Sequence, residues 1–480
     1  MSQKPALQDM VIVIPGIMGS VLQKDGKDLW APSRQALSKA LFHLNQVLDD
    51  LRIDHDPGDD DLGDGIRATR LVQSIHGLFG LHLIDGYDQL IGMITQNFEV
   101  VAGAVDDPRP ANFYPFPYDW RRNNAVNARK LQRLVETGLK RWRNHSGAQD
   151  AKVIILAHSM GGLVARYYLE VLGGWQDCRA LFTYGTPHRG SVNALDVLCN
   201  GWKKYRLDLS EVVRSLPAAY QLLPMYEMIQ VEGNYAGVTT INTLPNLPRQ
   251  KIDPAVAFHR AIKQAVEANE QDERYREDYR IIPIVGTRQR TNQSATFANG
   301  HLSVARTPPT WLEAALADGD GTVPRISAIP AELKDDYRET FVSEQHSWLH
   351  SNPAMLENLR SRLETIRAPD IPSVLGLQLP VVPAEQPAID LAFDELYGPD
   401  DPITIHAELR YAREDPGTLE AGITPVGADT WSTYAFVSDS RGWTLTLEKL
   451  PPDMYYLRVQ TRPFIPYAPP PVHGVFEVVG

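Results

Sequence analysis

Short apolar runs recur along the first three quarters of the chain, each only four or five residues long. Their β-branched residues and the turn residues around them predict buried strands. Apolar residues at helical spacing lie between these runs, at 125–142 and 163–172. This alternation of strand and helix predicts a largely parallel sheet with helices on both faces. The predicted strands are residues 11–14, 152–156, 180–184, 281–285 and 339–342.

Two long segments interrupt the alternation, at 29–87 and 202–279. Long excursions at the strand ends of a parallel sheet usually form lids or caps over a site. We therefore expect an α/β domain over residues 1–368 with two cap insertions.

The composition changes near residue 368. Five prolines punctuate residues 369–387, which predicts a linker. From 388 to 480 the chain shows short runs of alternating apolar and polar residues, separated by turns and without helical periodicity. That pattern predicts a second domain, a small all-β sandwich of immunoglobulin or fibronectin type.

Charge and cysteine usage narrow the class of partner and the location. The 480 residues carry a formal net charge of −12, which argues against a nucleic-acid partner. No stretch approaches the ~18 apolar residues of a membrane span, and the N-terminus has no secretory signal. The two cysteines, Cys178 and Cys199, are too few for a disulfide framework, so we expect a cytoplasmic location.

An acidic stretch, DHDPGDDD at 54–61, raises the question of a metal site. It lacks the alternating ligand spacing and the final glutamate of a calcium loop. We therefore expect a solvated surface loop here and no metal.

The string AHSMGG at 157–162 lies directly after one predicted strand and directly before a predicted helix. Strand, tight turn with a serine at its tip, then helix is the nucleophile elbow of an α/β-hydrolase. The strained turn requires small residues two places before and two places after the serine, and Ala157 and Gly161 meet that requirement. The pattern predicts Ser159 as a nucleophile, against the plainer alternative of a buried serine in an ordinary turn.

A serine nucleophile needs a base and an orienting acid, and in this fold the chain order is serine, acid, histidine. The glycine-rich string DGDGTVP begins at Asp318, and both Asp318 and Asp320 suit the role of acid. His346 follows a predicted strand and is the expected base, with His350 as its competitor. Histidine suits this role because its ordinary pKa of about 6.5 lets it accept and return a proton near neutrality.

The oxyanion hole needs two backbone N–H groups. One normally comes from the residue after the nucleophile, here Met160. The other should come from the loop after an early strand; the string PGIMGS at 15–20 is such a loop, and the N–H of Ile17 is the expected donor. His158 and His188 precede the acid in the chain, so we interpret them as lining or structural groups.

With these pieces assembled, the chain resembles the lecithin:cholesterol acyltransferase family, which includes lysosomal phospholipase A2 and phospholipid:diacylglycerol acyltransferases. The resemblance implies Ser159 as nucleophile and His346 as base. It favours Asp320 over Asp318, because the family's acid directly follows the glycine of its motif. The matching strings are VIPGIMGS at 13–20, FPYDWR at 116–121, AHSMGG at 157–162, YGTPHRGS at 184–191, RSLP at 214–217, LLP at 222–224 and GDGTV at 319–323.

The same resemblance matches the oxyanion donors to Ile17 and Met160. It gives the string YDWR at 118–121 no place in the triad, so we expect that string to be structural. The segment 29–87 corresponds loosely to the membrane-touching segment of the family. Its apolar run is expected to line an acyl groove or touch lipid, with plain burial as an equal alternative. The run comprises Leu71, Val72, Ile75, Leu78, Phe79, Leu81, Leu83 and Ile84.

The function expected from the sequence is a serine acyl-ester hydrolase of lipid esters, foremost a phospholipase, that works through an acyl-enzyme without cofactor or metal. A lipid acyltransferase is the alternative in the same class, and an inactive hydrolase-fold scaffold is the alternative in another. We expect a lipid or ester substrate and transient contact with a membrane surface; a protein partner for residues 388–480 stays open. Because every candidate catalytic residue precedes Pro369, we expect a chain ending there to hydrolyse a soluble ester.

Overall fold

A parallel sheet of six strands lies at the centre of the protein, with the strand order β15-β12-β7-β6-β1-β5. The computed structural model describes residues 4–30, 46–58, 61–72, 86–204, 207–333, 340–365, 387–411, 418–439, 442–462 and 468–479. All five predicted strands are present, and the three-residue β5 is too short to appear as a pattern. The strands are β1 (Met10–Ile14), β5 (Phe113–Pro115), β6 (Val153–His158), β7 (Cys178–Tyr184), β12 (Arg280–Gly286) and β15 (Thr340–Val342).

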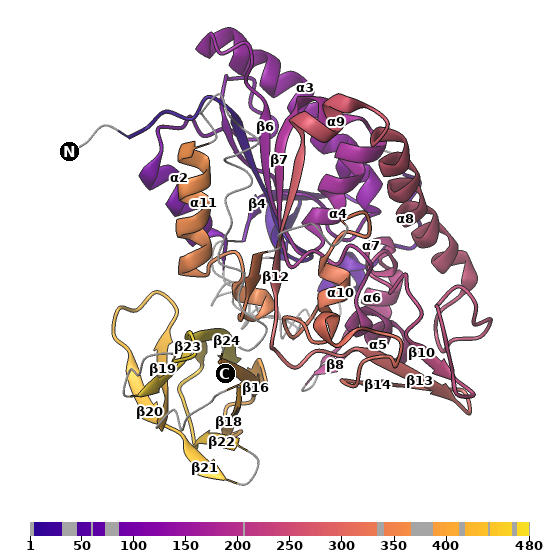
Figure 1. The fold of residues 1–480 in the computed structure, drawn as a ribbon, viewed down its shortest axis with the longest axis vertical. Coiled ribbons are helices and arrows are strands. Elements are labelled where there is room, and N and C mark those ends of the chain that lie inside the picture. Colours follow the sequence, from indigo (N-terminus) through magenta and orange to yellow (C-terminus); the bar gives the residue numbers. More distant parts are fainter. Residues whose placement is uncertain are drawn as a thin grey trace.

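Helices cover both faces of this sheet (Figure 1). One face carries α3 (Asn124–Ser146), α4 (Gly161–Arg166) and α8 (Arg249–Asn269), and the other carries α2 (Asp88–Asn97) and α11 (Pro353–Thr365). Because successive side chains of a strand point to opposite faces of the sheet, each strand contributes residues to the apolar core on either face. In β6, for example, Ile155 belongs to the first core, and Ile154 and Leu156 belong to the second.

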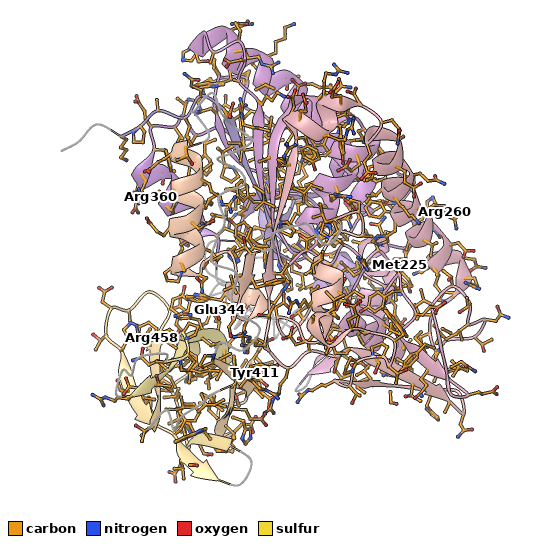
Figure 2. All side chains as sticks on the ribbon, in the orientation of Figure 1. Met225, Arg260, Glu344, Arg360, Tyr411 and Arg458 are labelled. Carbon is orange, nitrogen blue, oxygen red and sulfur yellow. The ribbon has the colours of Figure 1, made fainter. Side chains whose placement is uncertain are left out.

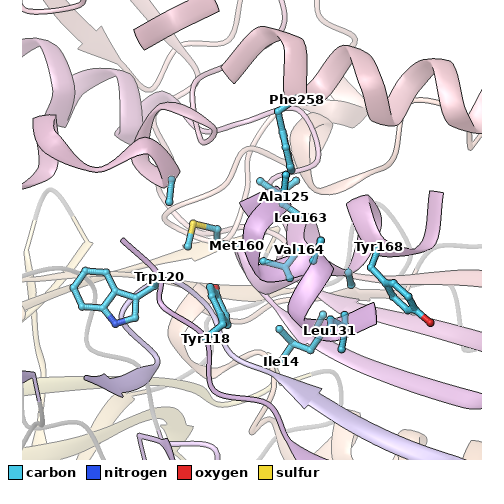
Figure 3. Packing of buried hydrophobic residues seen from close by; sticks show 14 of the residues in the cluster. Ile14, Tyr118, Trp120, Ala125, Leu131, Met160, Leu163, Val164, Tyr168 and Phe258 are labelled. Carbon is cyan, nitrogen blue, oxygen red and sulfur yellow. The ribbon is translucent and has the colours of Figure 1, made fainter. Parts of the chain in front are cut away.

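Helix α4, which follows the predicted nucleophile, is buried along its whole length. Figure 3 shows Leu163 and Val164 among apolar side chains that include Ile14 of β1, Leu131 of α3 and Phe258 of α8. The π-helix η1 (Tyr167–Val171) continues α4 and completes the helical stretch predicted at 163–172. Because helix and strand are both anchored in the core, the turn between them is held at both ends.

The two predicted cap segments hold small elements of their own. In the first, β4 (Ile66–Leu71) pairs with β2 (Ser20–Lys24), which pairs with β3 (Lys27–Trp30). Of the predicted acyl-groove run, Leu71 and Val72 are buried, whereas residues 73–85 lie outside the described residues.

The second cap segment precedes β12 and is mainly helical. Two of its strands join a four-stranded sheet of order β11-β10-β13-β14. None of the described helices combines the length and the apolar character that a membrane crossing requires. Besides α8, the elements within this segment are β8 (Lys203–Lys204), β9 (Leu207–Asp208), α6 (Ser210–Ser215), α7 (Pro217–Tyr220), β10 (Ile229–Val231), β11 (Asn234–Ala236) and α9 (Glu273–Asp278). The neighbouring elements outside it are α5 (Val192–Asn200), β13 (Ser294–Ala298), β14 (His301–Ala305) and α10 (Arg325–Ala328).

The C-terminal strands form two sheets that share one apolar core, of orders β16-β18-β22-β21 and β17-β24-β23-β19-β20. The fold class expected from the sequence, an α/β-hydrolase followed by a small all-β sandwich, is confirmed. The predicted linker, 369–387, lies outside the described residues except for Pro387. The strands are β16 (Ala388–Phe393), β17 (Leu396–Tyr397), β18 (Ile403–Arg410), β19 (Thr418–Pro425), β20 (Ser432–Ala435), β21 (Val437–Asp439), β22 (Gly442–Leu447), β23 (Asp453–Arg462) and β24 (Val472–Val478).

Candidate active site

Ser159 stands at the tip of the turn between β6 and α4. Its backbone has a φ of +50°, a left-handed conformation that non-glycine residues rarely adopt. The serine N–H donates to the carbonyl of Tyr184 at the end of β7, 2.8 Å away. A side chain at Gly161 would collide with the backbone carbonyls of Ile14 and Pro15, which explains the small residue two places after the serine. The local geometry is that of the predicted nucleophile elbow.

The structure brings Ser159, His346 and Asp320 together in one hydrogen-bonded series. The Nε2 atom of His346 lies 2.9 Å from the serine Oγ, and its Nδ1 atom lies 2.7 Å from Oδ2 of Asp320. All three residues are buried. Their separations are those of a nucleophile, a base and an orienting acid. Their catalytic roles remain predictions.

The carboxylate of Asp320 is fixed by its own loop. Its Oδ1 atom accepts hydrogen bonds from the backbone N–H groups of Thr322 and Val323, at 2.9 and 2.7 Å. Its carbonyl accepts the backbone N–H of His346 at 2.8 Å, so acid and base are joined twice. Both oxygens therefore have partners, and the one facing the imidazole is held in place.

Asp318, the other acid left open by residue chemistry, is held differently. Its Oδ2 atom accepts the backbone N–H of Arg288 at 3.1 Å, and burial raises the pKa of this carboxyl to about 6. Its backbone also has a positive φ, +88°. Of the two aspartates, the structure places Asp320 against the imidazole.

Both predicted oxyanion donors lie beside the nucleophile. Met160 is the next residue, and Ile17 lies in the turn after β1, where a side chain at Gly16 would come within 2.9 Å of the Ser159 Cβ. Within the described part of the chain, the N–H groups of Ile17 and Met160 have no hydrogen-bond partner. An oxyanion hole requires two unpaired backbone donors near the nucleophile, so the role of these two N–H groups stays a prediction.

A buried bridge that the sequence did not reveal joins the oxyanion turn, residues 15–20 after β1, to His346. The Tyr87 hydroxyl accepts the N–H of Gly16 at 2.8 Å and lies 3.0 Å from Nδ1 of His158. The Nε2 atom of His158 lies 3.1 Å from the carbonyl oxygen of His346. Burial, with the nearby rings of His350 and His346, holds the pKa of His158 well below its ordinary value. A neutral His158 with its proton on Nε2 satisfies both contacts, since the tyrosine then donates to Nδ1.

The competitor His350 packs its ring against Tyr87 and His158, with ring centroids 4.7 and 4.6 Å away. His188 is mostly buried and lies 3.4 Å from the Thr183 hydroxyl, and burial lowers its pKa well below the ordinary value. Neither histidine takes the place of His346 beside the serine. The position of His158 agrees with its interpretation as a lining or structural group. Tyr87 was missed, and nothing in the sequence around it indicates its contact.

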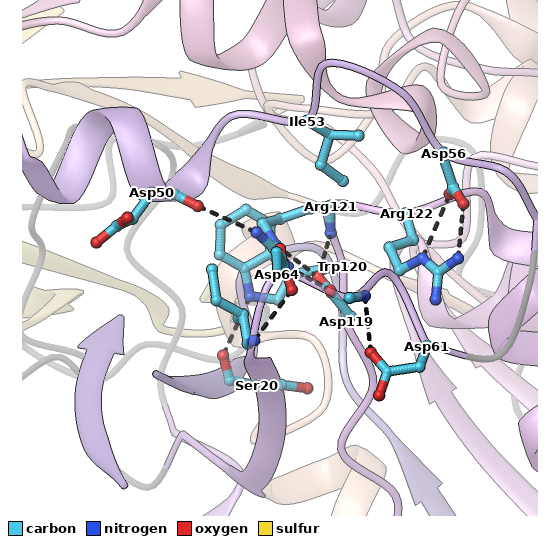
Figure 4. A network of polar contacts seen from close by, with 12 residues as sticks. Ser20, Asp50, Ile53, Asp56, Asp61, Asp64, Asp119, Trp120, Arg121 and Arg122 are labelled. Atoms are coloured by element: carbon cyan, nitrogen blue, oxygen red, sulfur yellow. Dashed lines mark hydrogen bonds and ion pairs between the residues drawn. The ribbon is translucent and has the colours of Figure 1, made fainter. Parts of the chain in front are cut away.

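The YDWR string contacts both the start of β2 and the first cap segment (Figure 4). The Trp120 indole donates to the carbonyl of Ser20 at 3.1 Å. Arg121, which is fully buried, pairs with Asp119 at 2.7 Å and Asp64 at 2.9 Å. The string is structural, as expected, because its charges are used in packing the segment rather than in the triad.

The expectation of a solvated surface loop at 54–61 is corrected at one position. Asp56 is buried in its ion pair with Arg122, 2.6 Å away, and it also accepts the N–H of Asn123. That pairing lowers the pKa of Asp56 against the opposing effect of burial. Among the described residues, no group of three or more His, Cys, Asp or Glu side chains is arranged to hold a metal.

Comparison with known proteins places this geometry in context. The sequence model of the lecithin:cholesterol acyltransferase family matches residues 108–355, just over half of the chain. The match contains Ser159, Asp320 and His346; Ile17 precedes it and the sandwich follows it.

Among curated proteins, the chain resembles an uncharacterized protein of Saccharomyces cerevisiae, at 27% identity over 187 residues. The match covers 38% of this chain and 23% of the yeast protein, so the chain spans under a quarter of that relative's length.

Two solved structures of a Bacillus licheniformis lipase also resemble the chain. The mature form shares 13% identity over 76% of this chain and 93% of its own, with a TM-score of 0.30. The propeptide form shares 12% identity over 99% of this chain and 94% of its own, with a TM-score of 0.32. At such scores the likeness adds nothing to what the strand order already establishes.

Proposed function

This chain belongs to the lecithin:cholesterol acyltransferase family, and from that premise we propose that it is a serine acyl-ester hydrolase of lipids, with phospholipids as its foremost substrates. The observation that carries the proposal is the hydrogen-bonded series from the Ser159 Oγ through His346 to Asp320. An inactive scaffold would have no need to keep these three side chains buried and aligned.

The chemistry follows from the positions of these atoms. The Ser159 Oγ attacks the ester carbonyl carbon while His346 Nε2 takes its proton. The N–H groups of Ile17 and Met160 stabilise the negative charge that develops on the carbonyl oxygen. The tetrahedral intermediate then collapses, and the leaving alcohol departs with the proton held by His346. Asp320 keeps the imidazole in the tautomer that presents Nε2 to the serine and stabilises the imidazolium.

The acyl-serine that remains is released by water in a hydrolase and by an alcohol in a transferase. We propose hydrolysis as the main reaction. Transfer stays the second candidate because the matched family is named for an acyltransferase. Labelled phospholipid, supplied with and without diacylglycerol, a sterol or a long-chain alcohol, separates the two. Free fatty acid should dominate in every mixture; a labelled ester that exceeds free acid once an acceptor is present would make the protein a transferase.

A fluorophosphonate probe tests whether the site is live. The wild-type protein should be labelled on the peptide that contains Ser159, and Ser159→Ala should not be labelled. A serine elsewhere on the surface, such as Ser361→Ala, is the matched control and should leave labelling intact. Failure of the wild-type protein to react, at probe concentrations that label known serine hydrolases, would favour the scaffold alternative.

A further inference from the structure

The C-terminal sandwich contacts the base loop, residues 343–352, which connects β15 to α11 and carries His346. Glu344, two residues before His346, is fully buried and lies where the α/β domain meets the sandwich (Figure 2). Its Oε1 atom accepts the backbone N–H of His473 on β24 at 2.9 Å, and its Oε2 atom lies 2.9 Å from Nδ1 of the same histidine. The same two oxygens also accept the Gln345 N–H and the Asn352 amide, at 3.0 and 3.1 Å. One carboxylate thus joins the base loop to the sandwich.

The sandwich also contacts Trp348, which follows His346 by two residues. The ring of Trp348 stacks on the His473 imidazole, with centroids 5.1 Å apart and planes 12° apart. Trp348 also packs against Tyr456 of β23 in a T-shaped arrangement, with ring centroids 5.2 Å apart. His473 therefore contacts the loop at positions 344 and 348, which flank His346.

The loop of the acid is tied to the sandwich as well. The Gln289 side chain bonds the backbone of β16 twice, donating to Ile389 at 2.9 Å and accepting from Leu391 at 3.2 Å. The Gln289 backbone donates to Gly319 at 3.0 Å and bridges to Asp320. A single buried glutamine thus connects β16 with the residue that orients the base.

Resting on the proposed function, we propose that the sandwich is a positioning element of the active site and that His473 is its principal positioning residue. The base loop has little regular structure of its own, only the 3₁₀ turn His346–Trp348. Its placement therefore depends on side-chain contacts, and a shift of about 1 Å in a catalytic group can cost roughly 10²-fold in rate. The proposal predicts that a chain ending near Pro369 loses activity, contrary to the expectation from the sequence, which stays untested.

The test uses full-length variants that separate the two contacts of His473. His473→Phe keeps a ring to stack on Trp348 and removes the Nδ1 donor, whereas His473→Asn keeps a donor at the δ position and removes the ring. His406→Phe is the matched control, since His406 is a half-buried sandwich histidine whose Nδ1 lies 3.0 Å from the Thr444 hydroxyl. Each variant is assayed on a short soluble ester, with kcat and KM determined separately.

We expect His473→Phe to lower kcat at least tenfold with KM nearly unchanged, His473→Asn to recover part of that loss, and His406→Phe to match the wild-type protein. A second readout is the low-field proton NMR resonance of the His346–Asp320 hydrogen bond, which can be measured in proteins that also carry Ser159→Ala because it does not require catalysis. This resonance should shift or broaden in His473→Phe and stay unchanged in His406→Phe. This second readout reports the geometry of the base directly.

A folded His473→Phe with wild-type kcat and an unchanged resonance would overturn the proposal. If that variant does not fold, Glu344→Gln replaces it, because a neutral side chain of the same shape removes one acceptor from the same contact. Wild-type kcat in folded Glu344→Gln would overturn the proposal, as would failure of both variants to fold, since the contact would then serve the whole fold. An inactive wild-type protein, in contrast, would contradict the proposed function and not the positioning inference.

Discussion

The nucleophile and the base of the candidate site are held in different ways. Ser159 is positioned mainly by its neighbours in the chain, since β6 and α4 on either side of it are buried in the core. His346 is positioned by residues far away in the chain: Asp320 at 26 positions, His158 at 188, and His473 through Glu344 at 129. One end of the triad is encoded locally, and the other is assembled by tertiary contacts.

This difference teaches where the site is vulnerable. A turn between two buried elements keeps its shape unless one of its own residues is changed. A loop held by long-range side-chain contacts changes when any of the distant partners changes. Substitutions remote in sequence should therefore act on the base far more than on the nucleophile.

The largest effects should come from the triad itself. Ser159→Ala, His346→Ala and Asp320→Asn are each expected to lower kcat by roughly 10³–10⁶-fold, with about 10⁴-fold for the acid, while the fold survives. Asp318→Asn is the matched control for the acid and should keep kcat within about twofold, because its carboxylate does not face the imidazole. Steady-state kinetics on a soluble ester decides; loss of activity in Asp318→Asn together with normal turnover in Asp320→Asn would exchange the two roles.

An intermediate loss of activity is expected when the buried bridge from Gly16 through Tyr87 and His158 to His346 is broken. Tyr87→Phe removes the hydroxyl that joins Gly16 to His158 and leaves the buried Gly16 N–H unpaired, at a cost of about 1–3 kcal/mol. We expect kcat to fall by roughly 10–100-fold because the oxyanion turn and the base loop lose their common support. Tyr220→Phe, which removes a buried hydroxyl bonded to the Arg214 carbonyl in the cap, is the control. Equal losses in both variants would mean that the bridge has no specific role.

The smallest effect on activity, and a measurable one on stability, is expected at Asp318. Burial raises the pKa of this carboxyl from 3.8 to about 6, so the folded protein retains a proton there that the unfolded chain releases. The contribution of this group to stability is thus fully present below about pH 4 and is lost as the pH rises through about 6.

Asp318→Asn keeps the shape of the side chain, tolerates the positive φ and cannot ionise. We expect it to be more stable than the wild-type protein by roughly 1–2 kcal/mol at pH 7, with the difference vanishing near pH 4. Denaturant unfolding at the two pH values measures this. A stability difference that does not depend on pH would contradict the assigned cause.

The turn that carries Ser159 could be predicted from the sequence because its determinants are close together in the chain. The strand before Ser159, the small residues around it and the chain order of acid and base are all visible in short strings. Asp318 and Asp320 could be separated only by resemblance, because two aspartates in one glycine-rich turn have the same chemistry until the backbone decides which one faces the histidine.

The long-range contacts that hold His346 in place could not be predicted in the same way. Tyr87 and His158 are 71 positions apart, and Glu344 and His473 are 129 apart, without a period or motif to connect them. The burial of Asp56 was missed for a related reason, since an aspartate in an acidic string appears solvated until its partner Arg122 is known. Composition and spacing indicate the secondary structure that each segment favours, whereas these contacts depend on which segments pack together in the folded protein.

The most direct test of the central claim is to detect the acyl group on Ser159. The protein is mixed with a short-chain nitrophenyl ester, quenched in acid within milliseconds to seconds, and analysed by intact and peptide mass spectrometry. Wild-type protein should gain the mass of one acyl group on the peptide containing Ser159, and His346→Ala should gain it far more slowly. Turnover of the ester by wild-type protein without any such adduct, or with the acyl group on another residue, would contradict the assignment of Ser159 as the nucleophile.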